Sequence, residues 1–358
     1  MSSEIYDAQK LLAEIGEMDV GNVSLMEVCG THTMAIAKSG LRNVLPENIK
    51  LLSGPGCPVC VTPPEVIDAI LDLSMQKNII IATYGDMIKV PGSVHGENLA
   101  KSRALGARVE VVYSPLDAVR LAEENPSYEV VFLGAGFETT APGTAVAIGA
   151  ASEKRLKNFS VFSMLKTVEP ALRALIADDG FNVRGFLCPG HVATIIGEEG
   201  FRFLAEEFKI PCVIGGFEPH EILMAVYMLL RQIESGEPKV ENAYPQAVKS
   251  NGNPLAVNMI RKYLALRRDI WRGLGEIDMS GLGICDEYAE FDAERKFDIK
   301  IKPPKETSPC LCGDVICGRI YAHECPLFGK VCTPENPVGP CMVSGEGACA
   351  AAYKYGGQ

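Results

Sequence analysis

The sequence predicts an α/β fold in which two similar parallel-sheet domains are followed by a cysteine-rich C-terminal domain. Short apolar, β-branched runs each lead through Gly, Pro or Ser into a helical period, which is the rhythm of a mostly parallel sheet. Seven of the 13 cysteines fall between Cys310 and Cys349, where apolar periodicity is almost absent. We therefore expect domains over residues 21–140, 141–240 and 241–358, the last including an N-terminal helix at 1–20.

The first domain is expected to open with two strands that each end in a cysteine-containing loop. A helix should follow from Pro63, because Thr62 can serve as its N-cap and Glu65 can complete a capping box. Three further β-branched runs then predict strands. The expected strands of this domain cover residues 25–29, 51–53, 78–82, 109–113 and 130–133.

The second domain repeats this rhythm, with strands expected over 159–162, 185–188 and 211–214 and helices over 171–176 and 220–233. Gly-Phe-Glu occurs at Gly136 and again at Gly216, each time after an apolar strand and before a proline and a helix. This echo indicates two similar halves, although strand-to-helix joints can look alike in any α/β protein. Residues 238–254 read as a linker, and 259–271 as a basic amphipathic helix.

Composition narrows the partners and the location. A net charge of -11 argues against nucleic acid or an anionic membrane as the main partner, because both attract basic surfaces. The N-terminus lacks the basic and apolar regions of a secretory signal, and the apolar runs are too short to span a bilayer. We expect a cytoplasmic protein, in which clustered thiols favour metal binding or catalysis over disulfides.

The C-terminal cysteines predict a metal centre. A stretch with so little apolar periodicity needs something covalent or metallic to order it. Thiolate-rich sites select zinc or iron–sulfur clusters. The irregular spacing lacks the paired two-residue knuckles of structural zinc, and the Cys-Pro and Cys-Thr-Pro steps favour an iron–sulfur cluster. Since a cluster takes four thiolates, some of the seven cysteines must serve otherwise.

A second candidate is Cys57-Pro-Val-Cys60, which follows Gly54-Pro-Gly at a strand-to-helix turn. Two thiols at this spacing near a helix N-terminus favour reversible dithiol chemistry. The alternative, two cysteines that only pack, is weaker because the Gly-Pro-Gly run exposes the turn.

A third candidate is Cys29 with His32, at the end of a strand where α/β sheets place their sites. The pair could be a nucleophile with its base, or a ligand with a helper, whereas an inert buried cysteine is the alternative. Thr31 and Thr33 are expected to cap the next helix, whose N-terminus would favour a Cys29 thiolate.

Other positions are weaker candidates. The loop 84–93 and the run 137–140 place charged and hydroxyl groups after strands. His191 and His220 fit helix caps or the core as well as a site, and Cys188 and Cys212 are expected to pack within strands.

Several unusual strings, in order along nearly the whole chain, resemble the HypD family of [NiFe]-hydrogenase maturation proteins. They are Glu27-Val-Cys-Gly-Thr-His32, Gly54-Pro-Gly-Cys-Pro-Val-Cys60, Tyr84-Gly-Asp86 through Val90-Pro-Gly-Ser93, Gly136-Phe-Glu-Thr-Thr-Ala-Pro142, Cys188-Pro-Gly-His191 and Cys332-Thr-Pro-Glu-Asn-Pro-Val-Gly339.

The resemblance implies a scaffold that works with a small HypC-type chaperone to assemble an Fe(CN)2CO unit. A HypE-type protein would donate the cyanide, and the hydrogenase large subunit would receive the finished unit. The iron would bind Cys29, with Cys57 and Cys60 beside it as a redox dithiol and as further metal-site residues, and with His32 assisting. A [4Fe–4S] cluster would feed electrons to the dithiol.

By matching the family pattern, the resemblance gives this cluster four ligands in the C-terminal region. These are Cys312, Cys325, Cys332 and Cys349. Cys310, Cys317 and Cys341 lie outside the matched pattern.

The residues suit this chemistry, since low-spin iron favours soft thiolates and a dithiol carries the two electrons of cyanide transfer. Two alternatives remain at this point. One is a stand-alone thiol–disulfide oxidoreductase fed by the cluster, and the other is a zinc-stabilised binding protein.

Overall fold

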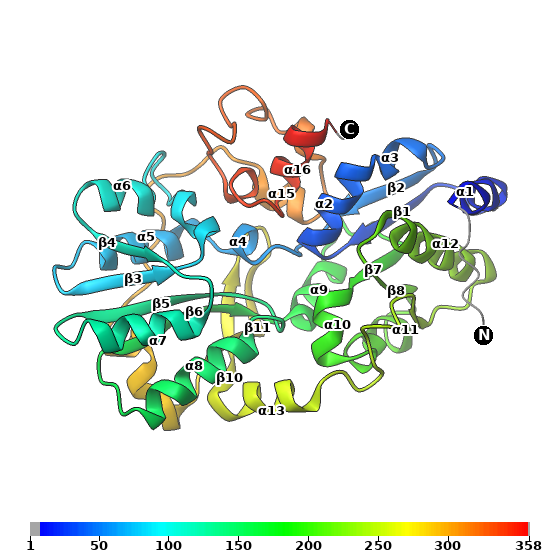
Figure 1. Ribbon diagram of the computed structural model, residues 1–358. Coiled ribbons are helices and arrows are strands. Elements are labelled where there is room, and N and C mark those ends of the chain that lie inside the picture. Colours follow the sequence, from blue (N-terminus) through cyan, green and yellow to red (C-terminus); the bar gives the residue numbers. More distant parts are fainter. Residues whose placement is uncertain (1–7, 357–358) are drawn as a thin grey trace.

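The computed structural model describes residues 8–356 and confirms the α/β prediction, with two sheets side by side (Figure 1). The first sheet has five strands, all parallel, in the order β2-β1-β7-β8-β9. Its strands are β1 (Val23–Glu27), β2 (Ile49–Ser53), β7 (Gly185–Pro189), β8 (Cys212–Gly215) and β9 (Val240–Asn242).

The second sheet has six strands in the order β10-β11-β6-β5-β3-β4. Four of them are parallel, and β10 and β11 form an antiparallel hairpin that pairs with β6 through Gly281 and Lys166. The strands are β3 (Ile79–Thr83), β4 (Arg108–Val111), β5 (Glu129–Gly136), β6 (Phe159–Lys166), β10 (Leu264–Trp271) and β11 (Gly275–Ile284).

The chain crosses between the two sheets three times, so the expected boundary near residue 140 does not separate them. β1 is paired with β7, for example at Leu25 and Gly185, although the two strands were expected in different domains. Strand periodicity tells which face is buried, but not which distant strand lies alongside, and this is why the sequence misplaced the division.

Helices cover both faces of each sheet. Three lie on the outer face of the first sheet: α1 (Ala8–Glu17), α2 (Gly30–Ser39) and α12 (Pro219–Ser235). Two lie on the outer face of the second: α7 (Pro115–Glu124) and α8 (Ala141–Glu153). The inner faces share one core with α4 (Pro58–Val61), α5 (Pro64–Ser74), α6 (Leu99–Ala104), α9 (Val168–Ile176), α10 (Gly190–Ile196) and α11 (Arg202–Glu206). Within residues 8–356, no helix is long and apolar enough to cross a membrane.

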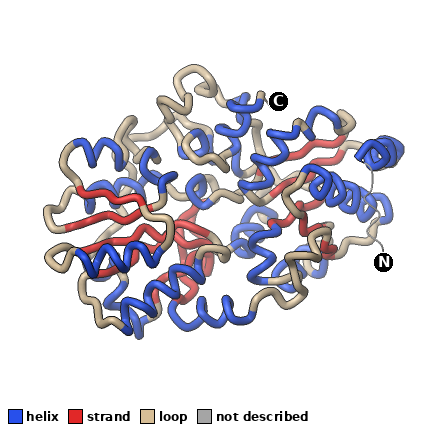
Figure 2. Tube along the Cα trace, in the orientation of Figure 1, coloured by secondary structure: helices blue, strands red, loops and turns tan. Residues whose placement is uncertain are grey.

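The cysteine-rich segment packs where the two sheets meet, and most of it is loop (Figures 1 and 2). Its regular elements are short: α15 (Cys312–Ile316) and α16 (Ala348–Tyr355), with single 3-10 turns at Ala322–Glu324 and Pro340–Met342. Val315, Ile316 and Met342 are buried in the core that also holds the inner faces of both sheets. The segment therefore completes this shared core instead of forming one of its own.

Two predictions about helices were wrong. The described N-terminus of α5 has no side-chain cap, because Pro63 occupies the N-cap position. Thr62 instead donates its hydroxyl to the carbonyl oxygen of Pro58 at 2.9 Å and ends the short α4. The short helix α4 itself was not predicted from the sequence.

The expected helix over 259–271 is also wrong in its second half. Helix α13 covers Pro254–Tyr263, and the chain then turns into β10. A run of Leu, Ala and Arg suits a helix locally, but pairing with β11 overrides that preference. The expected linker 238–254 likewise contains the short β9.

Candidate functional site

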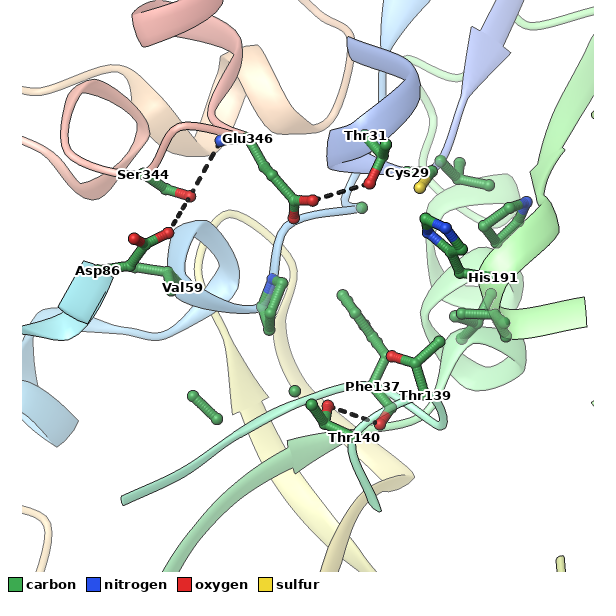
Figure 3. Close-up of a pocket in the computed structure, with 18 of the residues that line it drawn as sticks. Cys29, Thr31, Val59, Asp86, Phe137, Thr139, Thr140, His191, Ser344 and Glu346 are labelled. Atoms are coloured by element: carbon green, nitrogen blue, oxygen red, sulfur yellow. Dashed lines mark hydrogen bonds between the residues drawn. The ribbon is translucent and has the colours of Figure 1, made fainter. Parts of the chain in front are cut away.

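A cavity of about 320 Å³ lies between the carboxyl ends of strands from both sheets and the C-terminal segment (Figure 3). Cys29 follows β1, Phe137 follows β5 and His191 follows β7, so three strand ends deliver side chains to one place. Glu346 reaches the cavity from the segment between Cys341 and Cys349. A crevice beyond the carboxyl ends of strands is where open α/β sheets bind ligands.

Cys29 is the N-cap residue of α2, and its side chain is 8% exposed. Burial raises the pKa of its thiol to about 12; the backbone N–H of His32 lowers the pKa, and the carboxylates of Glu27 and Glu346 raise it. The helix N-terminus therefore does not suffice to ionise the sulfur, contrary to expectation.

The turn around Cys29 is fixed by a buried carboxylate. Glu27 accepts the backbone N–H of Cys29 at 3.1 Å and the hydroxyl of Thr33 at 2.5 Å, and burial raises the pKa of Glu27 to about 7. Thr31 donates its hydroxyl to Glu346 at 2.8 Å. The prediction that these two threonines cap α2 is therefore wrong, since both are engaged by carboxylates and α2 has no side-chain cap within the described chain.

His32 lies behind the cavity and is not one of its lining residues. It is fully buried, and its Nε2 is 2.8 Å from the carbonyl oxygen of Gly216. Because a carbonyl only accepts, Nε2 carries the proton. Burial lowers the pKa of His32 to about 4, so the ring is neutral, and its Nδ1 has no partner among the described residues.

The ring of Phe217 contacts both His32 and His191, and His191 is the one of these two histidines that lines the cavity. The Phe217 ring stacks on His32 with centroids 4.7 Å apart and on His191 with centroids 3.9 Å apart. Figure 3 shows His191 beside the Cys29 sulfur. The repeated Gly-Phe-Glu was therefore a usable signal: Phe137 lines the cavity, and Phe217 positions one of the residues that line it.

The predicted dithiol is brought together next to the cavity. Cys57 caps α4 and accepts the backbone N–H of Cys60 at 3.3 Å, and the two sulfurs are 2.7 Å apart. Both are buried, and burial raises the pKa of Cys60.

Several of the C-terminal thiols contact one another, and the thiols of Cys310 and Cys312 are hydrogen-bonded. Cys312 and Cys341 have sulfurs 2.6 Å apart, and the Cys341 thiol also neighbours Cys60 and Cys349. Burial raises the pKa of Cys332, which also neighbours Cys310 and Cys349 and accepts the backbone N–H of Val338 at 3.4 Å. Within residues 8–356, no three Cys, His, Asp or Glu side chains form a closed metal shell.

The remaining candidates fall into distinct places. Tyr84 and Asp86 of the predicted loop line the cavity. Glu138 is buried and accepts the backbone N–H of Val168 at 2.9 Å. Cys317 turns from the other thiols toward the carbonyl of Gly273 at 3.6 Å. Cys188 and Cys212 are buried in neighbouring strands, and His220 lies in the first turn of α12.

Sequence reasoning missed Ser344 and Glu346, which lie among the cysteines but act beside the cavity. Ser344 is 1% exposed and accepts the thiol of Cys57 at 3.4 Å. Gly30 permits the approach of this segment, because a Cβ there would lie 2.5 Å from the Cβ of Glu346. The sequence held one usable signal, a Ser-Gly-Glu run of polar and flexible residues inside a cysteine cluster.

Comparisons with known proteins agree on one family. The sequence model of the family described as "HypD: Hydrogenase formation hypA family" matches residues 6–356. The hydrogenase maturation factor HypD of Rhizobium leguminosarum bv. viciae is 45% identical over 338 residues, covering 92% of this chain and 88% of the relative. That of Rhodobacter capsulatus is 44% identical, covering 99% and 94%, and that of Escherichia coli K12 is 43% identical, covering 92% and 88%.

Proposed function

This chain belongs to the HypD family of hydrogenase maturation factors, and we propose that it is the scaffold on which the Fe(CN)2CO unit of a [NiFe]-hydrogenase is assembled. One observation carries the proposal: a single thiol, Cys29, faces a cavity together with an imidazole and a carboxylate, and a dithiol adjoins it. Low-spin iron that carries cyanide and carbonyl favours soft thiolate donors.

In this proposal the iron is cargo, held by Cys29 and by one thiolate of a HypC-type chaperone. A single scaffold thiolate leaves positions open for cyanide and carbonyl. Because burial keeps the free Cys29 thiol protonated, iron binding must release that proton. His191 and Glu346 line the same cavity and supply bases that can accept it. The finished unit would then pass to the hydrogenase large subunit.

Cyanide would arrive as a thiocyanate on a HypE-type donor. Cleaving its carbon–sulfur bond takes two electrons and yields a thiolate and cyanide. Cys57 and Cys60 can supply both electrons by forming a disulfide and releasing two protons. We assign these two residues to this redox role and not to iron ligation, because their sulfurs face each other instead of lining the cavity.

The C-terminal thiols have the donor chemistry of a [4Fe–4S] cluster. We propose the expected set, Cys312, Cys325, Cys332 and Cys349, as its ligands. Cys312 contacts Cys310, which neighbours Cys332, and Cys341, which neighbours Cys349. A cluster held there would supply single electrons.

Infrared spectroscopy of the anaerobically purified complex with a HypC-type chaperone tests the function. We expect cyanide and carbonyl stretching bands in the complex and none in either protein alone. The close Cys57–Cys60 pair also supports a second candidate, a stand-alone thiol–disulfide oxidoreductase. Fast disulfide exchange with small substrates in a complex that never shows these bands would favour that second candidate and contradict the first.

A further inference from the structure

Ser344 lies between the buried dithiol and an exposed carboxylate. Its hydroxyl accepts the thiol of Cys57 at 3.4 Å. It also donates to Asp86 at 3.5 Å and accepts the backbone N–H of Glu346 at 3.2 Å (Figure 3). Ser344 and Cys57 are 1% and 5% exposed, whereas Asp86 is exposed at the edge of the cavity. The three residues come from different parts of the chain and meet only in the fold.

The hydrogen bonds that link Cys60, Cys57, Ser344 and Asp86 all run in one direction, from the dithiol toward the carboxylate. The Cys60 thiol donates to Cys57 at 2.7 Å, Cys57 donates to Ser344, and Ser344 donates to Asp86. Such an arrangement passes a proton outward by shifting each hydrogen one step along. The last contact is long for a hydrogen bond between oxygens, but catalytic hydrogen bonds are often long in the free protein, and Asp86 is exposed enough to move.

We propose that Ser344 and Asp86 form a proton relay that carries the proton of Cys57 from the buried dithiol to solvent. The inference rests on the proposed redox role of Cys57 and Cys60 and adds the path that this role requires. Oxidation of two buried thiols releases two protons, and water cannot reach the sulfurs freely at such low exposure.

Neighbouring groups do not offer an equivalent route. The Cys60 thiol contacts Cys341, whose own neighbours Cys312 and Cys349 are thiols with no exposed base. Glu346 lies near Ser344, but Ser344 accepts its backbone N–H and donates to Asp86, not to the Glu346 carboxylate. Asp86 is therefore the carboxylate that can receive the proton and pass it to water.

The step balances with a small aromatic disulfide, 2,2′-dithiodipyridine, as the oxidant. Cys57 loses its proton through Ser344 to Asp86, and its thiolate attacks one sulfur of the reagent, which releases one pyridinethiolate. Cys60 then attacks the Cys57 sulfur, its proton leaves, and the second pyridinethiolate departs. Two thiols and one reagent disulfide thus become one protein disulfide and two thiopyridones, with the released protons taken up by the leaving groups through solvent.

The test measures the rate at which the Cys57–Cys60 disulfide forms in the full-length protein under anaerobic conditions, by quenching and peptide mass spectrometry. Ser344→Ala should slow this rate about a hundredfold, the lower end of the scale expected when a positioned proton-transfer group is removed. Ser344→Thr, which keeps the hydroxyl, should restore it. Asp86→Asn should slow it similarly without disturbing the fold, because Asp86 is exposed. The solvent deuterium isotope effect should be larger in the wild type than in Ser344→Ala.

The outcomes separate the relay from the function on which it rests. Equal rates in the wild type, Ser344→Ala and Asp86→Asn would overturn the relay while leaving the dithiol redox-active. If Ser344→Ala slows disulfide formation and Ser344→Thr does not restore the rate, Ser344 acts only through packing. That result would also overturn the relay. A wild-type protein that forms no Cys57–Cys60 disulfide would instead refute the redox role itself.

Discussion

At the scale of single residues, Cys29 shows two effects in competition at one sulfur. Its place at the helix N-terminus favours a thiolate, whereas burial favours the thiol, and burial prevails. The position on the helix could be predicted from the sequence, because a strand followed by Gly-Thr-His gives it. The burial could not be predicted, because Glu346 approaches from a segment more than three hundred residues away.

The Cys29→Ala variant should keep its fold and the iron of the iron–sulfur cluster. It should lose the separate iron ion that would carry cyanide and carbonyl. The expected loss of stability is small, about 1 kcal/mol, because only one sulfur atom is removed. The measurement is infrared spectroscopy of the complex with the chaperone, together with total iron content. Cyanide and carbonyl bands of full intensity in this variant would mean that the iron is bound elsewhere.

Replacing Cys312 by Ala should lower the iron content and bleach the protein, whereas Cys310→Ala should retain its iron. The reason is that Cys312 is buried in contact with both Cys310 and Cys341, whereas Cys310 is only half-buried. The two variants are matched controls, since the residues are two positions apart and both contribute one thiol. The reverse result would replace Cys312 by Cys310 in the ligand set.

Glu138 should make stability depend on pH. Burial raises the pKa of this carboxyl from 4.5 to about 7, and its Oε2 has no hydrogen-bond partner among the described residues. A raised pKa means that the folded protein holds the proton more tightly than the unfolded chain. The resulting stabilisation is fully present below pH 4.5 and is lost as the pH rises to about 7, at most about 3 kcal/mol.

Glu138→Gln should remove this part of the pH dependence, because the amide stays neutral and can still accept the N–H of Val168. Urea unfolding between pH 4.5 and 7.5 measures it: the curves of wild type and variant should diverge across that window. Glu169→Gln is the control, since Glu169 influences Glu138 only through its charge and should change the profile little. Parallel curves for Glu138→Gln would show that the carboxyl is not protonated in the folded state.

At the scale of elements, the β10–β11 hairpin depends on a buried ion pair. Lys166 of β6 is 2% exposed; its Nζ is 2.8 Å from Asp269 and donates to the carbonyl of Ile270 at 3.0 Å. Lys166→Met should cost about 3 kcal/mol, because it leaves the buried Asp269 carboxylate with only the more distant guanidinium of Arg267, at 3.8 Å. The double variant Lys166→Met with Asp269→Leu should recover most of the loss, as measured by urea unfolding. A single variant as stable as the double one would show that the pair contributes nothing.

The same hairpin marks the limit of prediction from local pattern. All of the parallel strands except β9 were predictable, because each is a short apolar run that leads into a turn and a helical period. Residues 264–271 were predicted as helix, because their composition suits a helix and the partner β11 was not recognised as a strand. The predicted capping box failed for a similar reason, since the short α4 had already used Thr62.

At the scale of the whole molecule, the site exists because the chain crosses between the sheets. The first crossing carries Cys57 and Cys60, and the returns to each sheet bring strand ends toward Cys29. Motifs in the sequence singled out Cys29 and the Cys57–Cys60 pair, and the fold places Cys29 in the cavity and the pair next to it. The sequence could not show that Ser344 and Glu346 join them, because such contacts depend on how the C-terminal segment packs against α2 and α4.

This arrangement predicts that the cavity depends on metal in the C-terminal segment. The segment is mostly loop, so without its metal we expect residues after about 305 to loosen, because metal binding supplies folding free energy to such stretches. Glu346 and Ser344 would then move away from Thr31 and Cys57, and the turn at Cys29 would lose the contacts that cover it.

Cys332→Ala should therefore lose iron, become protease-sensitive in the segment, and exchange backbone hydrogens faster around residues 29–33 as well. Cys317→Ala is the control, because Cys317 is equally buried but turns toward Gly273, so it should keep its iron and both protections. Hydrogen exchange read by mass spectrometry measures both regions at once. Loss of iron with unchanged exchange around residues 29–33 would show that the cavity is built by the two sheets alone.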